Sequence, residues 1–313
     1  MFITQNKTIF FTVAAGVALL AAVAIASLGL KLGIEFTGGS TLEVSYVEER
    51  PAQERVEQAV VPFFDRAISV RPAGDNSYII QTPYIEGGRH SEIIEALTFG
   101  GERDVTEERF SSVGPSIGEE LRSKALIAIA LVVLGIVLFV AFSFRRGIDK
   151  EGNILNEGVS SWYYGFAAVV ALVFDTLIPA GLFAVLGVAI GAEVDLLFVT
   201  ALLAIIGFSV NDTIVVFDRV RENLQTNREA GHKETFAETV GKSLTQSFAR
   251  SINTSLTTSV VLIALYVFGG AVTQAFALTL LVGVLAGTYS SLFIASPLLV
   301  QFQEWSQKKK KTS

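Results

Sequence analysis

The sequence contains no cysteine and only two histidines, His90 and His232, which lie far apart along the chain. Without cysteine the chain can form neither a disulfide framework nor a thiolate metal site. Two histidines alone are too few for a zinc or iron centre, because such centres use three or four nitrogen, sulfur or oxygen ligands. We therefore expect no metal site.

Two further patterns are missing. No basic stripe is interleaved with aromatic residues, so nucleic-acid binding has no support. Gly241, Lys242 and Ser243 resemble the end of a phosphate-binding loop, but Phe236 stands where the first glycine of that loop belongs. Nucleotide hydrolysis is therefore not expected, and an energy-using membrane protein without it must draw on an ion gradient or on a partner.

Apolar residues, by contrast, are abundant. They make up 51% of the 313 residues, and the mean hydropathy is +0.52, values that soluble domains rarely reach. The long apolar run that follows Lys7 favours a retained span over a cleaved signal peptide. Because about 20 apolar residues cross a bilayer, we predict six spans, at about 8–29, 124–144, 165–189, 195–217, 254–272 and 276–300.

The spans divide the chain into four parts. We expect a first span with its tail over 1–30, an external domain over 31–123, a five-helix bundle over 124–302 and a basic cytoplasmic tail over 303–313. The acidic charge of the chain is concentrated outside the bundle. Residues 31–124 carry 17 acidic and 10 basic side chains, whereas the rest is nearly neutral.

Basic residues in short loops predict the orientation, because they favour the cytoplasmic side. The connections near 190–195 and 268–275 contain no lysine or arginine. Basic residues occur instead in three other regions: the connection 145–161, to which we assign no role, the connection after the fourth span, and the tail. Their basic residues are Arg145, Arg146, Lys150, Arg219, Arg221, Arg228, Lys233, Lys242, Arg250 and Lys308 to Lys311. We predict a multi-pass protein of the plasma (inner) membrane with both termini cytoplasmic and residues 31–123 extracytoplasmic.

The external domain has a readable pattern of strands and helices. Its order, βαββαβ, is that of a ferredoxin-like split unit. The domain is too small and too poor in convergent polar groups to be an enzyme. The predicted elements are strand 41–47, helix 52–64, a hairpin of strands 67–71 and 78–83, helix 90–99 and strand 104–113.

Ionisable residues inside the spans are candidates for function, because each costs about 2.5–3.5 kcal/mol on insertion scales. Asp175 lies in the third span and Asp212 in the fourth, where Asn211 is its polar neighbour. Asp175 has an alternative role as a hydrogen-bond partner in helix packing. Asp212, which is flanked by apolar residues, is the stronger candidate.

The fifth span adds a polar face. Arg250 lies at about the depth of Asp212, and a carboxylate and a guanidinium at equal depth suggest a pair that protonation could open. Arg250 has an alternative role as a snorkelling residue at a helix end, and the threonines could bond to their own backbone. The residues that share this face at helical spacing are Arg250, Asn253, Thr254 and Thr257.

The stretch around Asp212 also carries a resemblance to a known family. Residues 210–223, with the sequence VNDTIVVFDRVREN, closely resemble the signature of the SecF family. The motif Phe36-Thr37-Gly38-Gly39 after the first span is similar to the entry motif of that family. Further similar stretches are 113–118, 244–246 leading to Arg250, and 268–270.

The resemblance implies a function. SecF and SecD belong to the RND superfamily of proton-driven transporters. Membership would imply an accessory complex with a SecD-like subunit at the Sec translocon, a SecYEG-type channel. This complex uses the proton-motive force, with protons as coupling ion and no other cofactor, to promote translocation of unfolded secretory polypeptides.

The resemblance also implies roles for individual residues. Asp212 and Arg250 match the proton pathway, in which we include Asp175 and Asn211, and Thr37, Gly38 and Gly39 match the coupling motif. Two positions depart from the pattern of the family. Glu35 replaces the usual aspartate before Phe-Thr-Gly-Gly, and Phe174 stands where a histidine often precedes the aspartate that matches Asp175.

Two other functions compete with this interpretation. An intramembrane aspartyl protease would use Asp175 and Asp212 as a dyad that shares one proton, but no glycine lies two residues before Asp212. A proton-driven RND-type exporter of small molecules or lipids would usually carry twelve spans and larger external domains. We therefore expect a non-enzymatic export subunit.

Overall fold

The computed structural model describes residues 2–66, 68–86, 88–144, 161–231 and 234–312. The chain forms two compact units, a membrane unit and a head. The head comprises Leu32–Ile127 together with the short segment Glu193–Leu196. Several residues used in the predictions lie outside the described residues: Ala67, Arg145, Arg146, Lys150, His232, Lys233 and residues 145–160 of the connection 145–161.

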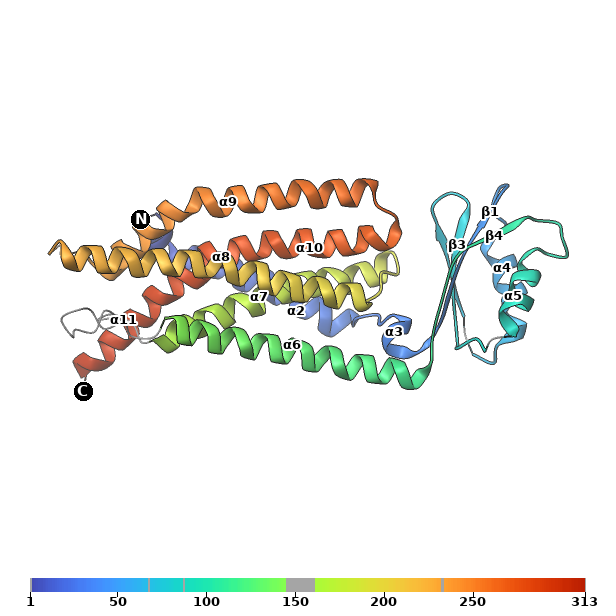
Figure 1. Cartoon of the computed structure of the whole chain (residues 1–313), viewed down its shortest axis with the longest axis horizontal. Helices are drawn as coiled ribbons and strands as arrows, with labels where there is room; N and C mark the ends of the chain where they lie inside the picture. The colour runs from blue at the N-terminus through green and yellow to red at the C-terminus, as the bar shows by residue number, and fades with distance from the viewer. Residues whose placement is uncertain (1, 67, 87, 145–160, 232–233, 313) are drawn as a thin grey trace. The chain divides into compact units, whose positions relative to one another are not determined.

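Within the described residues, six helices are long and apolar enough to cross a membrane, which confirms the predicted number of spans (Figure 1). The sixth is continuous through a short π-helix, η2. A four-residue helix, α1 (Phe2–Gln5), precedes the first span. The spans are α2 (Lys7–Leu28), α6 (Pro115–Ser143), α7 (Ser161–Ala189), α8 (Leu196–Glu229), α9 (Phe236–Phe268), and α10 (Ala271–Ser290) with η2 (Ser291–Ala295) and α11 (Ser296–Thr312).

Three of these helices extend beyond their apolar segments. Helix α6 begins at Pro115, before the span expected at 124, and α8 and α9 continue through much of the connection 218–253. Side-chain hydrogen bonds join the two polar extensions. Asn223 Nδ2 donates to Ser243 Oγ over 2.8 Å, and Asn227 Nδ2 donates to Thr239 Oγ1 over 3.0 Å. The helices α8 and α9 are therefore longer than their apolar segments, and these contacts hold their polar extensions together.

The head is a four-stranded antiparallel sheet with two helices on one face. The strand order is β2-β3-β1-β4, which confirms the predicted ferredoxin-like arrangement. Alternate residues of β1, such as Leu42 and Val44, are buried against Val56 of α4 and Ile93 of α5. The elements are β1 (Gly39–Tyr46), α4 (Gln53–Val60), η1 (Val61–Phe63), β2 (Ser69–Ala73), β3 (Ser77–Thr82), α5 (Arg89–Leu97) and β4 (Val105–Val113).

Small residues bring helices of the membrane unit close together. A Cβ added at Gly283 of α10 would overlap the side chain of Ile205 of α8, and one at Gly287 would lie 3.0 Å from Ser209 Cβ. Such small residues let helix backbones approach closely in membranes. The contact places the hydroxyl of Ser209 beside the last turn of α10.

Candidate functional site

Buried polar side chains of the membrane unit form a layer that connects four spans. Asp175 of α7 is fully buried. Ser209 Oγ of α8 donates a short hydrogen bond to Asp175 Oδ2, and the hydroxyl of Ser290, at the end of α10, also interacts with this carboxylate. Asp175 Oδ1 is buried without a hydrogen-bond partner in the described part of the chain. This oxygen can therefore accept a proton.

Asp212 repeats the arrangement one turn further along α8. Ser251 Oγ of α9 donates to Asp212 Oδ1 over 2.6 Å. Within the described residues, Asp212 Oδ2 is buried and has no hydrogen-bond partner. Asp175 and Asp212 thus bind different serines, and one oxygen of each carboxylate is open to protonation.

Two further hydroxyl groups lie beside Ser209, the partner of Asp175. Thr213 Oγ1, next to Asp212, lies 2.8 Å from Ser291 Oγ, the first residue of η2. Ser291 Oγ in turn donates to the carbonyl oxygen of Ser209 over 3.4 Å. Because π-helical turns inside α-helices frequently occur at functional sites, the position of η2 beside Ser209 and Thr213 supports a functional role for this layer.

Helix α9 also has a buried polar face, which was not predicted from the sequence. This row lies at intervals of four residues, so its members stack along one side of the helix. Ser255 of the row forms a short hydrogen bond with Thr288 of α10. The regular spacing was the signal that could have revealed it. The row consists of Ser243, Ser247, Ser251, Ser255 and Ser259, all of which are buried.

The predicted polar residues of α9 lie on an exposed side instead. Thr254 Oγ1 donates to the carbonyl oxygen of Arg250 and Thr257 Oγ1 to that of Asn253, each over 2.9 Å. Asn211 of α8 is exposed as well. In the described part of the chain no ion pair joins Asp212 to Arg250, although the positive charge of Arg250 acts on this carboxylate. The structure therefore brings Asp212 to Ser251 rather than to Arg250.

Thr37, Gly38 and Gly39 form a tightly packed joint within the head. Gly38 and Gly39 have φ angles of 71° and 138°, which glycine adopts readily. A Cβ at Gly38 would lie 2.7 Å from Pro115 Cα, and one at Gly39 would lie 2.8 Å from the carbonyl oxygen of Thr82. Thr37 Oγ1 closes α3 (Ile34–Thr37) by donating to the carbonyl oxygen of Gly33 over 3.0 Å.

Glu35 lies next to this joint, outside the spans, and faces other acidic residues. Burial raises the pKa of its carboxyl group above the ordinary value, and the negative charges of Asp195 and Glu193 raise it further. A hydrogen bond with the backbone and the positive charge of Arg109 act in the opposite direction. The net effect is a carboxyl group that holds its proton more tightly than an exposed glutamate does.

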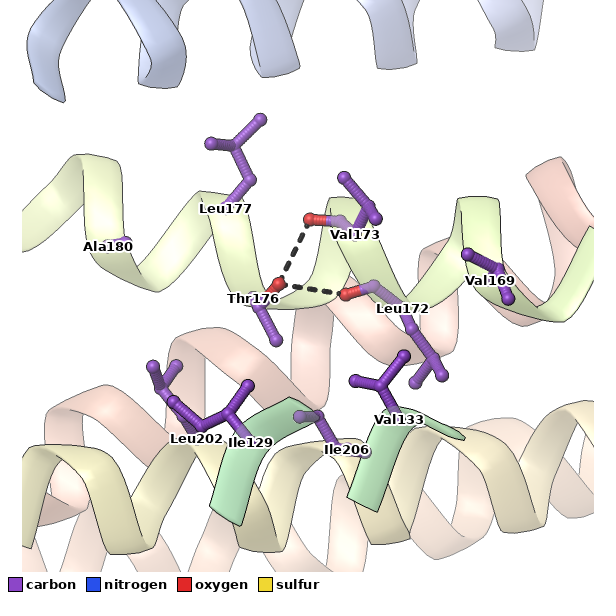
Figure 2. Close-up of a pocket in the computed structure, with 10 residues that line it drawn as sticks. All are labelled: Ile129, Val133, Val169, Leu172, Val173, Thr176, Leu177, Ala180, Leu202 and Ile206. Carbon is purple, nitrogen blue, oxygen red and sulfur yellow. Dashed lines mark hydrogen bonds between the residues drawn. The ribbon is translucent and has the colours of Figure 1, made fainter. Parts of the chain in front are cut away.

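A cavity of about 320 Å³ lies between α6, α7 and α8, close in sequence to Asp175 (Figure 2). Its lining is apolar except for Thr176, whose hydroxyl donates to the carbonyl oxygens of Leu172 and Val173 of the same helix. Among the residues that the structure describes, no further polar groups converge on it, so this lining lacks the features of a catalytic pocket. Its other lining residues are Ile129, Val133, Val169, Leu177, Ala180, Leu202 and Ile206.

Six spans, a buried polar layer with two carboxylates and a small ferredoxin-like head together define a polytopic membrane protein of the transport class. The chain belongs to the SecF family of protein translocase subunits. The family model described as protein export membrane protein SecD/SecF, C-terminal, matches residues 93–150 and 159–305. A second model, the SecD/SecF GG motif, matches residues 23–48.

Individual relatives agree with this assignment. The protein translocase subunit SecF of Anaerolinea thermophila is 36% identical over 97% of this chain and 95% of its own length. That of Thermobaculum terrenum is 38% identical over 88% of this chain and 85% of its own length. The family resemblance of residues 36–39 and 210–223 is thus confirmed. The chain is a translocase subunit, a transporter and not an enzyme, so the aspartyl-protease alternative fails.

Solved structures agree as well. The crystal structure of SecDF, a translocon-associated membrane protein from Thermus thermophilus, superposes with a TM-score of 0.79 at 30% identity and covers 97% of this chain. A SecDF structure in the super-membrane-facing form gives a TM-score of 0.66 at 30% identity. This chain spans 39% of the length of each of those SecDF chains.

Proposed function

We propose that this SecF subunit uses the proton-motive force to promote the translocation of secreted polypeptides. The observation that carries the proposal is the buried polar layer, in which Asp175 and Asp212 each accept a serine hydroxyl on one oxygen, while the other oxygen is buried and has no hydrogen-bond partner among the described residues. Ionisable residues in that position inside a membrane commonly mark proton relays. Asn211 and Arg250 flank the layer on its exposed side.

The energy available is sufficient for this role. A charge that crosses the whole membrane field yields about 2.3 kcal/mol per 100 mV. Two conformations of a protein commonly differ by a few kcal/mol. Protonation of Asp212 would remove its charge and weaken its hydrogen bond with Ser251 of α9, and could thereby shift α9 relative to α8.

The proposed complex contains a SecD-like subunit, a SecYEG-type channel and an unfolded secretory polypeptide. Support for the SecD-like subunit comes from the similarity to SecDF and from the exposed polar side of α9. Polar side chains that face lipid are costly, so Arg250, Asn253, Thr254 and Thr257 favour contact with a second helical bundle. We place both termini in the cytoplasm and residues 31–123 outside, with Thr37, Gly38 and Gly39 linking the first span to the head.

Neutralising Asp212 tests the proposal. Asp212→Asn preserves the size of the side chain and the hydrogen bond from Ser251, but it cannot bind and release a proton. We expect the variant to insert into the membrane, to bind its SecD-like partner and to lose the stimulation of export into energised vesicles. Glu229→Gln, which neutralises an exposed carboxylate at the end of α8, is the matched control and should retain it. Full stimulation by stably inserted Asp212→Asn would refute the role in proton coupling.

A further inference from the structure

The connection between α7 and α8 is built into the head. Residues Glu193–Leu196 belong to the same compact unit as the sheet, although β4, the last strand of the sheet, ends at Val113, far earlier in the sequence. Val194 forms a parallel bridge with Leu32, and its carbonyl oxygen accepts a hydrogen bond from Gly33 N over 2.8 Å. The connection thus pairs with the segment that leads from the first span into the head.

Glu193 fastens this connection to the sheet. Arg71 Nη2 of β2 donates to Glu193 Oε1 over 2.6 Å, and Gln81 Nε2 of β3 donates to Glu193 Oε2 over 2.5 Å. The side chains of Arg71 and Glu193 are 27% and 20% exposed. Hydrogen bonds to a charged, partly buried carboxylate are stronger than bonds between neutral groups, and here both carboxylate oxygens are held by adjacent strands.

Both bonds lie on the sheet face that α4 and α5 leave open. Ser69 pairs with Gln81, so Arg71, two residues further along β2, projects from the same face as Gln81. The buried residues Val70 and Ile80 project from the opposite face, into the helix-covered core. Glu193 therefore binds to the face of the sheet that does not contribute to the hydrophobic core.

We infer that Glu193 is a positioning residue that makes the start of α8 move with the head sheet. Only Val194 and Asp195 separate Glu193 from Leu196, where α8 begins. Asp212 lies 16 residues further along the same helix, about 24 Å at a rise of 1.5 Å per residue. A displacement of α8 at Asp212 thus reaches β2 and β3 through a continuous helix, a two-residue link and an ion pair.

The transport part of this inference rests on the proposed function, so the first experiment measures position alone. Spin labels at Asp75, in the turn between β2 and β3, and at Ile190, the residue after α7, report the distance between the head sheet and the segment that leads into the connection. We expect the distance distribution to broaden in Glu193→Ala and in Arg71→Ala, which removes the same ion pair from the other side. Glu102→Ala breaks an ion pair with Arg55 elsewhere in the head and should leave it unchanged.

The second experiment locks the connection. Because the chain has no native cysteine, a double variant with Leu32→Cys and Val194→Cys can form one disulfide only. Leu32 and Val194 are paired in a β-bridge, and the Cα atoms of such a pair are close enough for a disulfide. We expect the oxidised protein to stimulate export as well as the reduced one, and Glu193→Ala to lose most of the stimulation. An unchanged distance distribution in Glu193→Ala, or stimulation that only reductant restores in the locked protein, would overturn the inference. A failure of proton coupling would appear in Asp212→Asn and would leave the distance result standing.

Discussion

At the scale of single residues, the polar layer is built from two carboxylates and the hydroxyls that bind them, Ser209 with Asp175 and Ser251 with Asp212. Asp175 and Asp212 stand out because carboxylates are rare inside apolar segments. Their partners Ser209 and Ser251 do not stand out, because serine is nearly neutral on a hydropathy scale and is common in helices of every kind. Only the structure shows which of the many hydroxyls of the spans reaches each carboxylate.

Glu35 allows a prediction about pH. Because its pKa is raised in the folded protein, the folded state binds the proton more tightly than the unfolded state does. The stabilisation is therefore fully present below the ordinary pKa of a glutamate, and it is lost as the pH rises through the raised pKa of the folded state. Glu35→Gln should remove this dependence and raise the melting temperature at neutral pH.

Thermal unfolding of the purified protein at a series of pH values measures the effect. The difference between the parent and Glu35→Gln should grow from the ordinary glutamate pKa upward and level off above the raised one. Glu92→Gln, on an exposed position of α5, should follow the parent at every pH. Parallel melting curves for the parent and Glu35→Gln would contradict the burial of a protonated carboxyl group.

At the scale of whole helices, glycine contacts predict which positions tolerate a side chain. Gly283→Ala places a Cβ against Ile205 of the neighbouring helix and should destabilise the protein by about 1–3 kcal/mol, the usual effect of overpacking. Gly135→Ala in α6 meets no atom of the described residues within 4 Å. It should be neutral or stabilise by about 0.5–1 kcal/mol, because alanine favours helix.

Unfolding in mixed micelles with increasing denaturing detergent compares the two alanine variants directly. If both variants unfold like the parent, α8 and α10 are not packed as closely as Gly283 requires.

The number of spans could be predicted because long apolar segments are visible in the hydropathy of the sequence. The lengths of α8 and α9 could not, because their polar extensions depend on contacts such as those of Asn223 with Ser243 and Gln246.

At the scale of the whole molecule, the exposed polar side of α9 predicts where the partner binds. Thr257→Trp places a bulky side chain on the side shared with Arg250 and Asn253, so it should strongly reduce co-purification with a SecD-like subunit. Leu256 is 60% exposed and lies on another side of the same helix, because consecutive residues are about 100° apart. Leu256→Trp should keep the partner bound, and equal recovery of the partner with both variants would count against this docking side.

The head illustrates the limit of sequence reasoning at this scale. Its strand order followed from the pattern of local elements, because βαββαβ units have few compact arrangements. The contacts of Glu193 with Arg71 and Gln81 could not be predicted, because residues 122 and 112 positions apart produce no periodic pattern in the sequence. The same is true of the close approach of Gly38 to Pro115.

The π-helix η2 changes the direction in which the side chains of the last span point. Its i→i+5 pattern adds one residue to a turn, so the side chains of α11 are rotated by about 100° from where an uninterrupted α10 would place them. Ser290 and Ser291 can therefore face Asp175 and Thr213 while Leu299 and Val300 still point into the apolar core. Deletion of one residue within Ser291–Ala295 would restore regular α geometry, but only one of these two sets of side chains could then keep its direction.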